Sequence, residues 1–293
     1  MDERDLLAER FEAQRGQLRT VAYRMLGSLS EADDAVQEAW LRLGRVDTGK
    51  VDNLASWLRR VVTRICLDML RSRKSRRENL TGQQVLDRAL DTVERSDPED
   101  EALLADSVSR ALLVVLDTLQ PSERVAFVLH DMFAVPFDEI APIVERTPVA
   151  TKKLASRARR KVQGTPVVPA AELARQRQVV SAFLAAARAG DLTGILAVLA
   201  PGVVRRADPA ALPPSAAAEL HGSRAVAEGT VALARRSQFA ELALVNGAVG
   251  LVVAPRGQLL AALAFTIDDD KIAEYEVIAD PVRLQQLHLA VVD

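Results

Sequence analysis

The segment from residue 136 to residue 162, "PFDEIAPIVERTPVATKKLASRARRKV", restricts the fold more than any other part of the chain. Ile140, Ile143 and Val144 have the spacing of a short amphipathic helix. Thr147 and Pro148 then supply an N-cap residue and a proline at the first helical position, so a second helix is predicted to begin there. A short helix, a tight turn and a basic second helix are the pattern of a helix-turn-helix, whose second helix enters the major groove of DNA.

The second helix of this segment is predicted to be amphipathic. Four apolar residues are expected to face inward, and these are Val149, Leu154, Ala158 and Val162. The outward or flanking residues are mostly cationic, and these are Lys152, Lys153, Ser156, Arg157, Arg159, Arg160 and Lys161. An ordinary helical hairpin is the alternative interpretation. It is favoured by Pro142, which removes a backbone donor inside the first helix, and by Glu145, which stands in the turn where glycine would adopt a left-handed conformation at less cost.

A second basic stretch, "RRVVTRICLDMLRSRKSRR", covers residues 59–77 and holds eight Arg or Lys and one Asp. A helix is predicted to begin after Asn53, and its apolar face consists of Leu54, Trp57, Leu58, Val61, Val62, Ile65 and Met69. Arg60, Arg64 and Arg71 lie close to one another on the opposite face. Such a face can dock on phosphates, because each neutralised phosphate releases counterions. It can equally be a solvated face with favourable cations near the helix C-terminus, and this segment alone leaves both open.

An acidic stretch, "SEADDAVQEAWLRL", covers residues 30–43 and is predicted to be a helix with Ser30 as its N-cap. Val36, Trp40 and Leu43 form the inward stripe. The outer surface then carries Asp33, Asp34, Gln37, Glu38 and Arg42. Because carboxylates repel phosphate, this surface should not bind DNA. It is either solvated or docks a basic protein partner, and the spacing alone does not choose.

The distribution of these patterns predicts three domains and two linkers. Residues 1–78 form a first helical domain, 79–101 an acidic linker, 102–164 a second helical domain, 165–170 a Pro-rich linker and 171–293 a third domain. The third domain begins with two helical patterns and continues with five β-like runs, some separated by hairpin signals such as Asn246-Gly247. The predicted fold class is therefore two all-α domains followed by an α+β domain.

Composition excludes several classes of protein. The formal net charge of −2 says little about partners, so the local patches carry the information. The one cysteine, Cys66, lies in an apolar helical pattern and excludes an intramolecular disulfide and a thiolate zinc site. The charged N-terminus shows no signal peptide, and no apolar run approaches the roughly 18–20 residues of a membrane span. We expect a cytoplasmic protein without metal or cofactor and without a membrane partner.

Three ordered segments carry a family resemblance. "YRMLGSLSEADDAVQEAWLRL", "SWLRRVVTRICLDMLRSRKSRRE" and the helix-turn-helix segment resemble region 2 and region 4 of bacterial extracytoplasmic-function (ECF) sigma factors, over residues 11–163. The resemblance implies a transcription initiation factor, not an enzyme, that binds core RNA polymerase and promoter DNA.

The resemblance also implies roles for residues of this sequence. Asp34, Gln37 and Glu38 would bind the clamp helices of the polymerase β′ subunit. The residues implied at the −10 promoter element are Trp57, Arg59, Arg60, Thr63, Arg64 and Arg71. Those implied at the −35 element are Thr147, Lys152, Lys153, Ser156, Arg157 and Arg160.

The third domain resembles the SnoaL-like domain, of the nuclear-transport-factor-two-like cone fold, that is fused to one subgroup of these sigma factors. The resemblance implies regulatory contacts in cis at "DPAA" and "DPVRL", through Asp208, Asp280, Pro281, Arg283 and Leu284. The first stretch keeps only the Asp of the subgroup's D-G-G-G pattern. A W-L-P-E-P stretch typical of the subgroup's linker is replaced by "NLTGQQVLDR".

Two further functions remain as alternatives. One is a ligand-sensing helix-turn-helix regulator that binds duplex DNA without polymerase. The other is a cyclase- or isomerase-like enzyme in the third domain, with acid or base candidates Asp208, His221, Glu274, Tyr275 and Glu276. Because folds of this cone type leave a cavity, a small-molecule ligand in the third domain is a further hypothesis.

Overall fold

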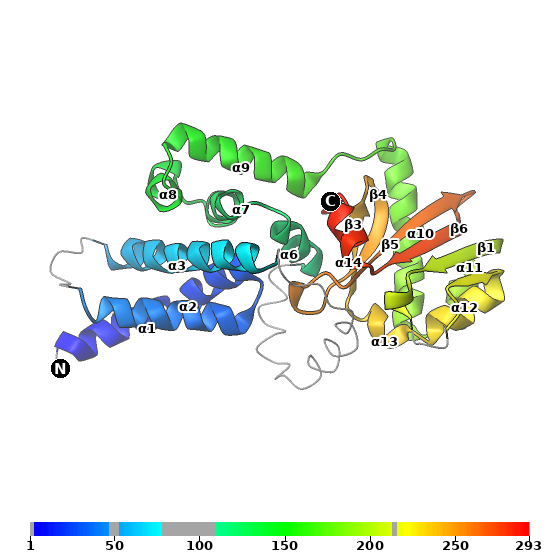
Figure 1. Cartoon of the computed structure of the whole chain (residues 1–293), viewed down its shortest axis with the longest axis horizontal. Helices are drawn as coiled ribbons and strands as arrows, with labels where there is room; N and C mark the ends of the chain where they lie inside the picture. Colours follow the sequence, from blue (N-terminus) through cyan, green and yellow to red (C-terminus); the bar gives the residue numbers. More distant parts are fainter. Residues whose placement is uncertain (1–2, 47–52, 78–108, 213–215, 293) are drawn as a thin grey trace. The chain divides into compact units, whose positions relative to one another are not determined.

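The computed structural model describes residues 3–46, 53–77, 109–212 and 216–292 (Figure 1). The predicted acidic linker at 79–101, and with it two domain boundaries, lies outside the described residues. The described chain forms two compact units, one with residues up to 77 and 116–159, the other with residues 109–115 and 160–292. The fold class is as predicted: helices come first, and a domain with a mixed sheet follows.

Three long helices build the first part of the first unit: α1 (Glu3–Leu26), α2 (Leu29–Leu43) and α3 (Leu54–Arg77). Their core contains the fully buried Met25, Leu43 and Leu58. Asn53 caps α3 by accepting a hydrogen bond from the Ser56 N–H at 3.0 Å, at the predicted start. Cys66 is buried in α3, and burial raises the pKa of its thiol to about 12, so it is a packing residue as expected.

The predicted N-cap of α2 is wrong by two residues. Ser28, not Ser30, precedes the helix, and its side chain accepts a hydrogen bond from the Glu31 N–H at 3.4 Å. Ser28 and Glu31 have the Ser-x-x-Glu spacing of a capping box, which is a better match than Ser30 with Asp33. Gly27 precedes the cap with φ of +71°, a conformation that favours glycine.

The rest of the first unit contains α7 (Pro121–Phe127), a π-helical turn (Val128–Met132), α8 (Phe137–Val144) and most of α9 (Pro148–Gln163). Helices α8 and α9 form the predicted helix-turn-helix. Glu145 ends α8 in the left-handed conformation, with φ of +56°, although it is not glycine. Thr147 is the N-cap of α9, because its Oγ1 accepts from the Ala150 N–H at 3.2 Å.

The inward face of α9 differs in part from the prediction. Thr151, Ala155, Ala158 and Val162 are buried. Val149 is 68% exposed, so the expectation that it faces inward is wrong. The buried positions repeat at intervals of three and four from Thr151, and this places Val149 outside the stripe.

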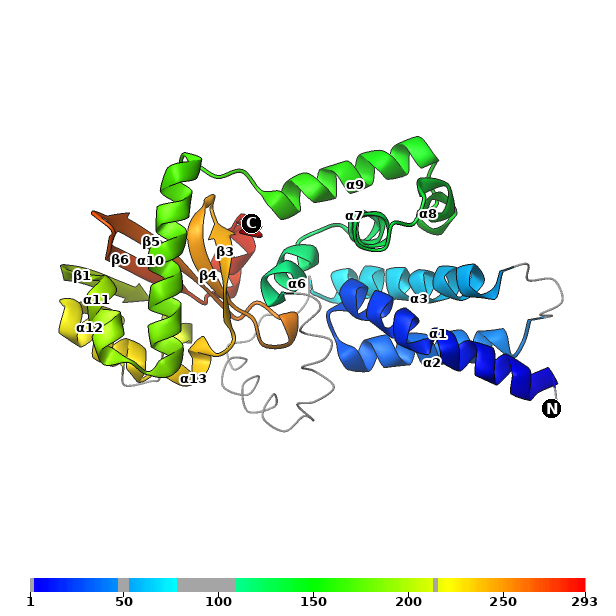
Figure 2. The same ribbon diagram turned by 180° about the vertical axis from the view of Figure 1, so that it is seen from behind.

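The second unit begins with the start of α6 (Arg110–Asp117) and continues through α10 (Ala170–Ala189), α11 (Leu192–Val198), α12 (Ser223–Val231) and α13 (Ala234–Ser237). Its sheet consists of β1 (Leu199–Ala207), β2 (Glu219–His221), β3 (Ala240–Val245), β4 (Ala248–Val253), β5 (Ala261–Asp268), β6 (Lys271–Ile278) and β7 (Leu289–Ala290). The short α14 (Pro281–Gln286) lies between β6 and β7. Helix α10 packs on one face of the sheet (Figure 2).

Strands β3 to β6 form the expected antiparallel meander, with Asn246 and Gly247 in the β3–β4 turn at φ of +52° and +85°. The strand order is β2-β1-β6-β5-β4-β3-β7. Strand β1 pairs in parallel with β6, and this pairing was not predicted. The strands β2 and β7 were also missed, because segments of three and two residues are too short to show a period.

Candidate protein and nucleic-acid interfaces

The outer face of α2 presents acid and amide groups to solvent. Asp34 and Gln37 are exposed, and the Glu38 side chain is 45% exposed and accepts a hydrogen bond from Arg42 Nε at 2.9 Å. Asp33 differs, because Arg19 donates to both its carboxylate oxygens at 2.7 and 3.1 Å. Within the described residues Asp34 has no ion-pair partner. The helix therefore offers one unpaired carboxylate, one amide and one half-exposed carboxylate to a partner.

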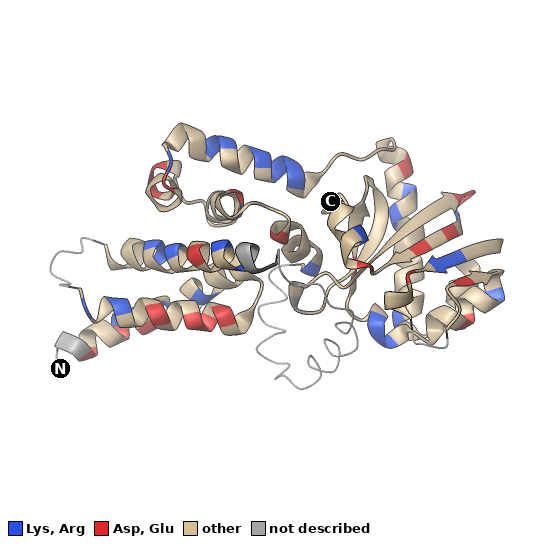
Figure 3. Ribbon diagram, viewed as in Figure 1, with Lys and Arg blue, Asp and Glu red and all other residues tan. Residues whose placement is uncertain are grey.

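Helix α9 is basic, in contrast to the acidic outer face of α2. Figure 3 shows basic positions along α9 and no acidic one. Lys152, Lys153, Ser156, Arg157 and Arg160 are all exposed. Arg157 Nε lies 3.5 Å from Oε1 of the buried Glu123, and Arg159 Nε donates to Asp131 at 2.7 Å. Two of the cations are therefore held in place by acidic residues of the same unit. The two lysines make no ion pair with any described residue and are available to phosphate.

The predicted −10 surface on α3 is partly covered by the helix-turn-helix. Arg59 Nη2 and Ser56 Oγ each donate to Glu139 Oε2 at 3.1 Å. Further along, Arg64 Nη2 donates to the Pro142 carbonyl at 3.1 Å. Each partner belongs to α8, so the arginines that would meet DNA are held by protein acceptors here.

The other predicted −10 residues divide into three groups. Arg71 pairs loosely with Glu145 Oε2 at 3.9 Å. Arg60 is exposed and Trp57 is half-buried. Thr63 is fully buried, and its hydroxyl donates to the Arg59 carbonyl at 2.7 Å, so its side chain is covered in the described conformation. Thr63 is seven residues after Ser56 and four after Arg59, so it lies on the same helical face as these two residues, the face that contacts α8.

The residues predicted to tie the third domain to the helical domains are bonded to one another. Asp208 accepts from the N–H groups of Ala279 and Asp280 at 2.9 and 3.0 Å, and Arg283 also donates to it. Burial opposes ionisation of Asp208, but these three donors outweigh burial and lower the pKa of its carboxyl.

The same cluster continues into α14. Asp280 caps this helix by accepting from the N–H groups of Val282 and Arg283 at 2.9 and 3.0 Å, with Pro281 at the first helical position. Arg283 Nη2 also donates to Glu276 at 2.7 Å, and Leu284 is half-buried. The cluster therefore fixes the junction of β1, β6 and α14 inside the domain.

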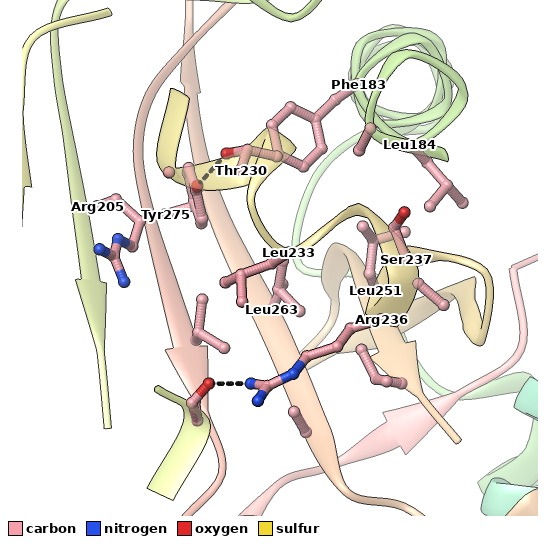
Figure 4. Close-up of a pocket in the computed structure, with 17 residues that line it drawn as sticks. Phe183, Leu184, Arg205, Thr230, Leu233, Arg236, Ser237, Leu251, Leu263 and Tyr275 are labelled. Atoms are coloured by element: carbon pink, nitrogen blue, oxygen red, sulfur yellow. Dashed lines mark hydrogen bonds between the residues drawn. The ribbon is translucent and has the colours of Figure 1, made fainter. Parts of the chain in front are cut away.

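A cavity of about 90 Å³ lies between the sheet and helices α10, α12 and α13 (Figure 4). Its walls are mostly apolar, with five polar side chains, and these are Arg205, Thr230, Arg236, Ser237 and Tyr275. Of the five acid and base candidates, Tyr275 lines it, whereas Asp208, His221, Glu274 and Glu276 do not. Among the described residues, no group of His, Cys, Asp and Glu has the arrangement of a metal site. No carboxylate or imidazole lines the cavity, so Tyr275 is the candidate acid or base that remains at it.

Two of the residues in these sites were not anticipated from the sequence. Glu139 gives no local signal, because its partners Ser56 and Arg59 are 83 and 80 positions away. Arg205 precedes Arg206 in β1, and successive strand residues point to opposite faces, so one of the two arginines had to point inward. That signal was present in "GVVRRA".

Comparison with known proteins gives two family matches and several similar proteins. The description "Sigma-70 region 2" matches residues 10–76, and "Sigma-70, region 4" matches residues 109–162. "ECF RNA polymerase sigma factor SigJ" of Mycobacterium tuberculosis is 38% identical over 92% of this chain and 91% of its own length. "Probable ECF RNA polymerase sigma factor SigI" of the same organism is 34% identical over 98% of both chains.

Solved structures were also matched, and one of them is a sigma factor of the same organism. The crystal structure of the M. tuberculosis extracytoplasmic function sigma factor SigJ covers 94% of this chain and 98% of that one, with 34% identity and a TM-score of 0.47. Separately, no helix in the described ranges is both long and apolar enough to cross a membrane.

Proposed function

The chain belongs to the ECF RNA polymerase sigma factors, which are transcription initiation factors and not enzymes, and from this premise we propose how its residues divide the work. As a sigma factor it binds core RNA polymerase and promoter DNA. One observation supports this division: the acidic helix α2 and residues 148–159 of the basic helix α9 belong to the same compact unit. A basic partner fits the first and phosphate fits the second.

Helix α2 is the proposed polymerase-binding element. Asp34 and Glu38 are four residues apart, and Gln37 lies between them on the same helical face. Because Asp34 carries no internal ion pair among the described residues, a cationic partner would not have to displace one. The clamp helices of the β′ subunit are the proposed partner. The complementary charges would speed association and fix orientation.

Helix α9 is the proposed reader of the −35 element. Its N-terminal residues lie closest to base edges when such a helix enters the major groove. Lys152 and Lys153 would bind phosphates, and Ser156 and Arg157 would face the groove. Thr147 has a capping role already, so its contribution is to fix the start of the helix. The exposed Val149 adds an apolar group at the N-terminal end, which suits contact with a thymine methyl group.

Helix α3 is the proposed reader of the −10 element, and the described conformation is proposed to be a closed state of it. Arg59 and Arg64 are engaged by Glu139 and the Pro142 carbonyl of α8. These acceptors would have to be displaced before DNA phosphates or bases could accept from the same two guanidinium groups. Reading of the −10 element therefore requires α3 to separate from α8, and polymerase binding would stabilise the separated state.

The C-terminal domain is proposed to modulate initiation in cis. Glu241 of β3 accepts from the Ala111 N–H at 3.0 Å and pairs with Arg110 at 3.6 Å, which joins this domain to the first turn of α6 in the region 4 segment. The domain would also bind a small molecule in its cavity. The chain would act in the cytoplasm, where RNA polymerase works.

The test is reconstituted transcription with core polymerase on a promoter library. We expect the full chain to direct specific initiation, and a chain that ends after Gln163 to initiate with altered efficiency. Glu241→Ala should shift activity in the same direction as the truncation, and the exposed Glu228→Ala serves as its matched control. A chain that never directs core polymerase to any promoter would overturn the proposal.

The two alternative functions are not favoured. A regulator that binds duplex DNA without polymerase and a cyclase-like enzyme both lack similar proteins among those reported above, whereas the sigma factors align over nearly the whole chain.

A further inference from the structure

The cavity of the C-terminal domain has a wall of mixed chemistry. Most of its lining is aliphatic, from residues such as Leu184, Leu233, Leu251 and Leu263 (Figure 4). Its volume is about 90 Å³, and it is open on one side. For scale, an engineered cavity of roughly 150 Å³ lined by apolar residues binds benzene. By this comparison the cavity accommodates about four non-hydrogen atoms, and a longer chain would extend through the open side.

Arg205 is a buried cation at this cavity. It is only 6% exposed, and Nη2 donates to the Ala217 carbonyl at 3.0 Å. Nη1 is buried and has no hydrogen-bond partner. Within the described residues no carboxylate pairs with Arg205. A permanently charged guanidinium with unused N–H donors is costly to bury, so an acceptor that reached Nη1 would be bound favourably.

The strand register places Arg205 next to a second polar group. Arg205 and Tyr275 are directly paired across β1 and β6, so both side chains lie on the same face of the sheet. Figure 4 shows Tyr275 between Arg205 and Thr230, and the Tyr275 and Thr230 hydroxyls are 2.9 Å apart. Burial raises the pKa of Tyr275, so its phenol stays neutral near pH 7.

The charged side chains that line the cavity are both cationic. Arg236 also lines the cavity and donates from Nη1 to the Ala211 carbonyl. No Asp, Glu or His is among the lining residues. Because the lining contains the buried Arg205 guanidinium and no acidic side chain, an anionic ligand is favoured over a neutral one.

We propose that this cavity binds a small, mainly apolar carboxylate whose head group is held by Nη1 of Arg205, with its carbon chain against the leucine-rich wall. The inference deepens the proposed ligand-responsive role of the C-terminal domain and rests on it. Planar guanidinium donors match carboxylate geometry better than a point charge does. The aliphatic wall would exclude highly charged anions such as inorganic phosphate.

The test uses the full chain without polymerase and titrates butanoate, hexanoate and 1-hexanol at constant ionic strength. Binding is measured by isothermal titration calorimetry and ligand-detected NMR. We expect hexanoate to bind saturably and at least tenfold more tightly than 1-hexanol. Arg205→Met should weaken hexanoate at least tenfold and leave 1-hexanol nearly unchanged. Arg224→Met, which removes the same charge from an 85% exposed side chain of the same domain, should change neither.

Two further variants keep the test decisive if Arg205→Met does not fold. Arg205→Lys retains the charge but loses the planar donors, and should weaken hexanoate. Ala187→Leu fills the cavity and retains Arg205, and should abolish binding of both probes. Absence of saturable binding by either carboxylate would overturn the proposal, as would hexanoate binding that none of the cavity variants alters.

The outcome is separable from that of the transcription experiment. Hexanoate binding without promoter-directed initiation would contradict the proposed initiation role alone. Initiation without carboxylate binding would contradict the ligand proposal alone.

Discussion

Arg59 Nη2 donates to Glu139 Oε2 at 3.1 Å, and this bond holds the helix implied in −10 recognition against the first helix of the helix-turn-helix. Ser56 shares the same acceptor oxygen. One carboxylate on α8 thus engages two side chains near the start of α3. The described conformation is one in which part of the basic face of α3 is neutralised from within.

The first prediction concerns this bond. Glu139→Gln should raise the affinity of the full chain for single-stranded DNA, because Arg59 and Ser56 lose a charged acceptor. The pair is partly exposed, at 27% and 40%, so the gain should be modest, about 0.2–1 kcal/mol or roughly 1.5- to 5-fold. Fluorescence anisotropy at low salt measures it.

The control for this prediction is Asp138→Asn, which removes the same charge from an exposed neighbour on α8. An equal gain from both variants would mean that net charge, not release of Arg59, raises the affinity.

The second prediction concerns α2. Reversing the charge of Asp34 and Glu38 together, to lysine, should weaken core polymerase binding about 100-fold or more, because like charges across an interface cost several kcal/mol. Circular dichroism should show an unchanged fold, since Asp34 is exposed and Glu38 half-exposed. A pull-down with core polymerase measures the loss.

The matched control reverses Glu9 and Glu12 of α1, which are also exposed and give the same change in net charge. If the control pair lost as much binding as Asp34 and Glu38, the acidic face of α2 would not be the polymerase site.

The third prediction separates phosphate contacts from base contacts on α9. Lys153→Ala should weaken binding of promoter DNA by holoenzyme about equally for all sequences and lower the salt slope by about 1. Val149→Ser should instead change the preference at a single base pair and leave the salt slope unaltered. Arg175→Ala, at an exposed position of α10, is the control for loss of a cation. A selection from randomised −35 elements at several salt concentrations distinguishes these outcomes.

The fourth prediction concerns pH. The folded-state pKa of Asp208 lies below its ordinary value, so its ionised form stabilises the fold. That contribution is fully present above the unfolded pKa of about 3.9 and is lost as pH falls through the lower folded pKa. Asp208→Asn should therefore destabilise the domain near pH 7 by about 1–3 kcal/mol, and lose less stability than the wild type on acidification below about pH 4.

Hydrogen exchange gives a local measurement of this effect. The Ala279 and Asp280 amides donate to Asp208, so their exchange at pH 7 should accelerate in Asp208→Asn. Asp268→Asn, at an exposed position, should leave these amides unchanged. Unaltered protection in Asp208→Asn would contradict the stabilising role.

The sequence by itself determined the elements whose signal is local. Thr147 and Pro148 fixed the start of α9, and Asn53 fixed the start of α3, because caps act within one helical turn. Asn246 and Gly247 fixed the β3–β4 turn in the same way. The ordered acidic and basic segments were also enough to indicate the family.

Only the tertiary structure decided which side chains are available. Thr63 lies in a basic face by sequence and is buried in the fold, and Arg59 is a free cation by sequence and a partner of Glu139, 80 positions away, in the fold. The strand "GVVRRA" required one inward arginine but did not say that it would be Arg205 or that it would border a cavity. Helical and strand periods specify a face, whereas the partner of that face depends on distant contacts that no local pattern encodes.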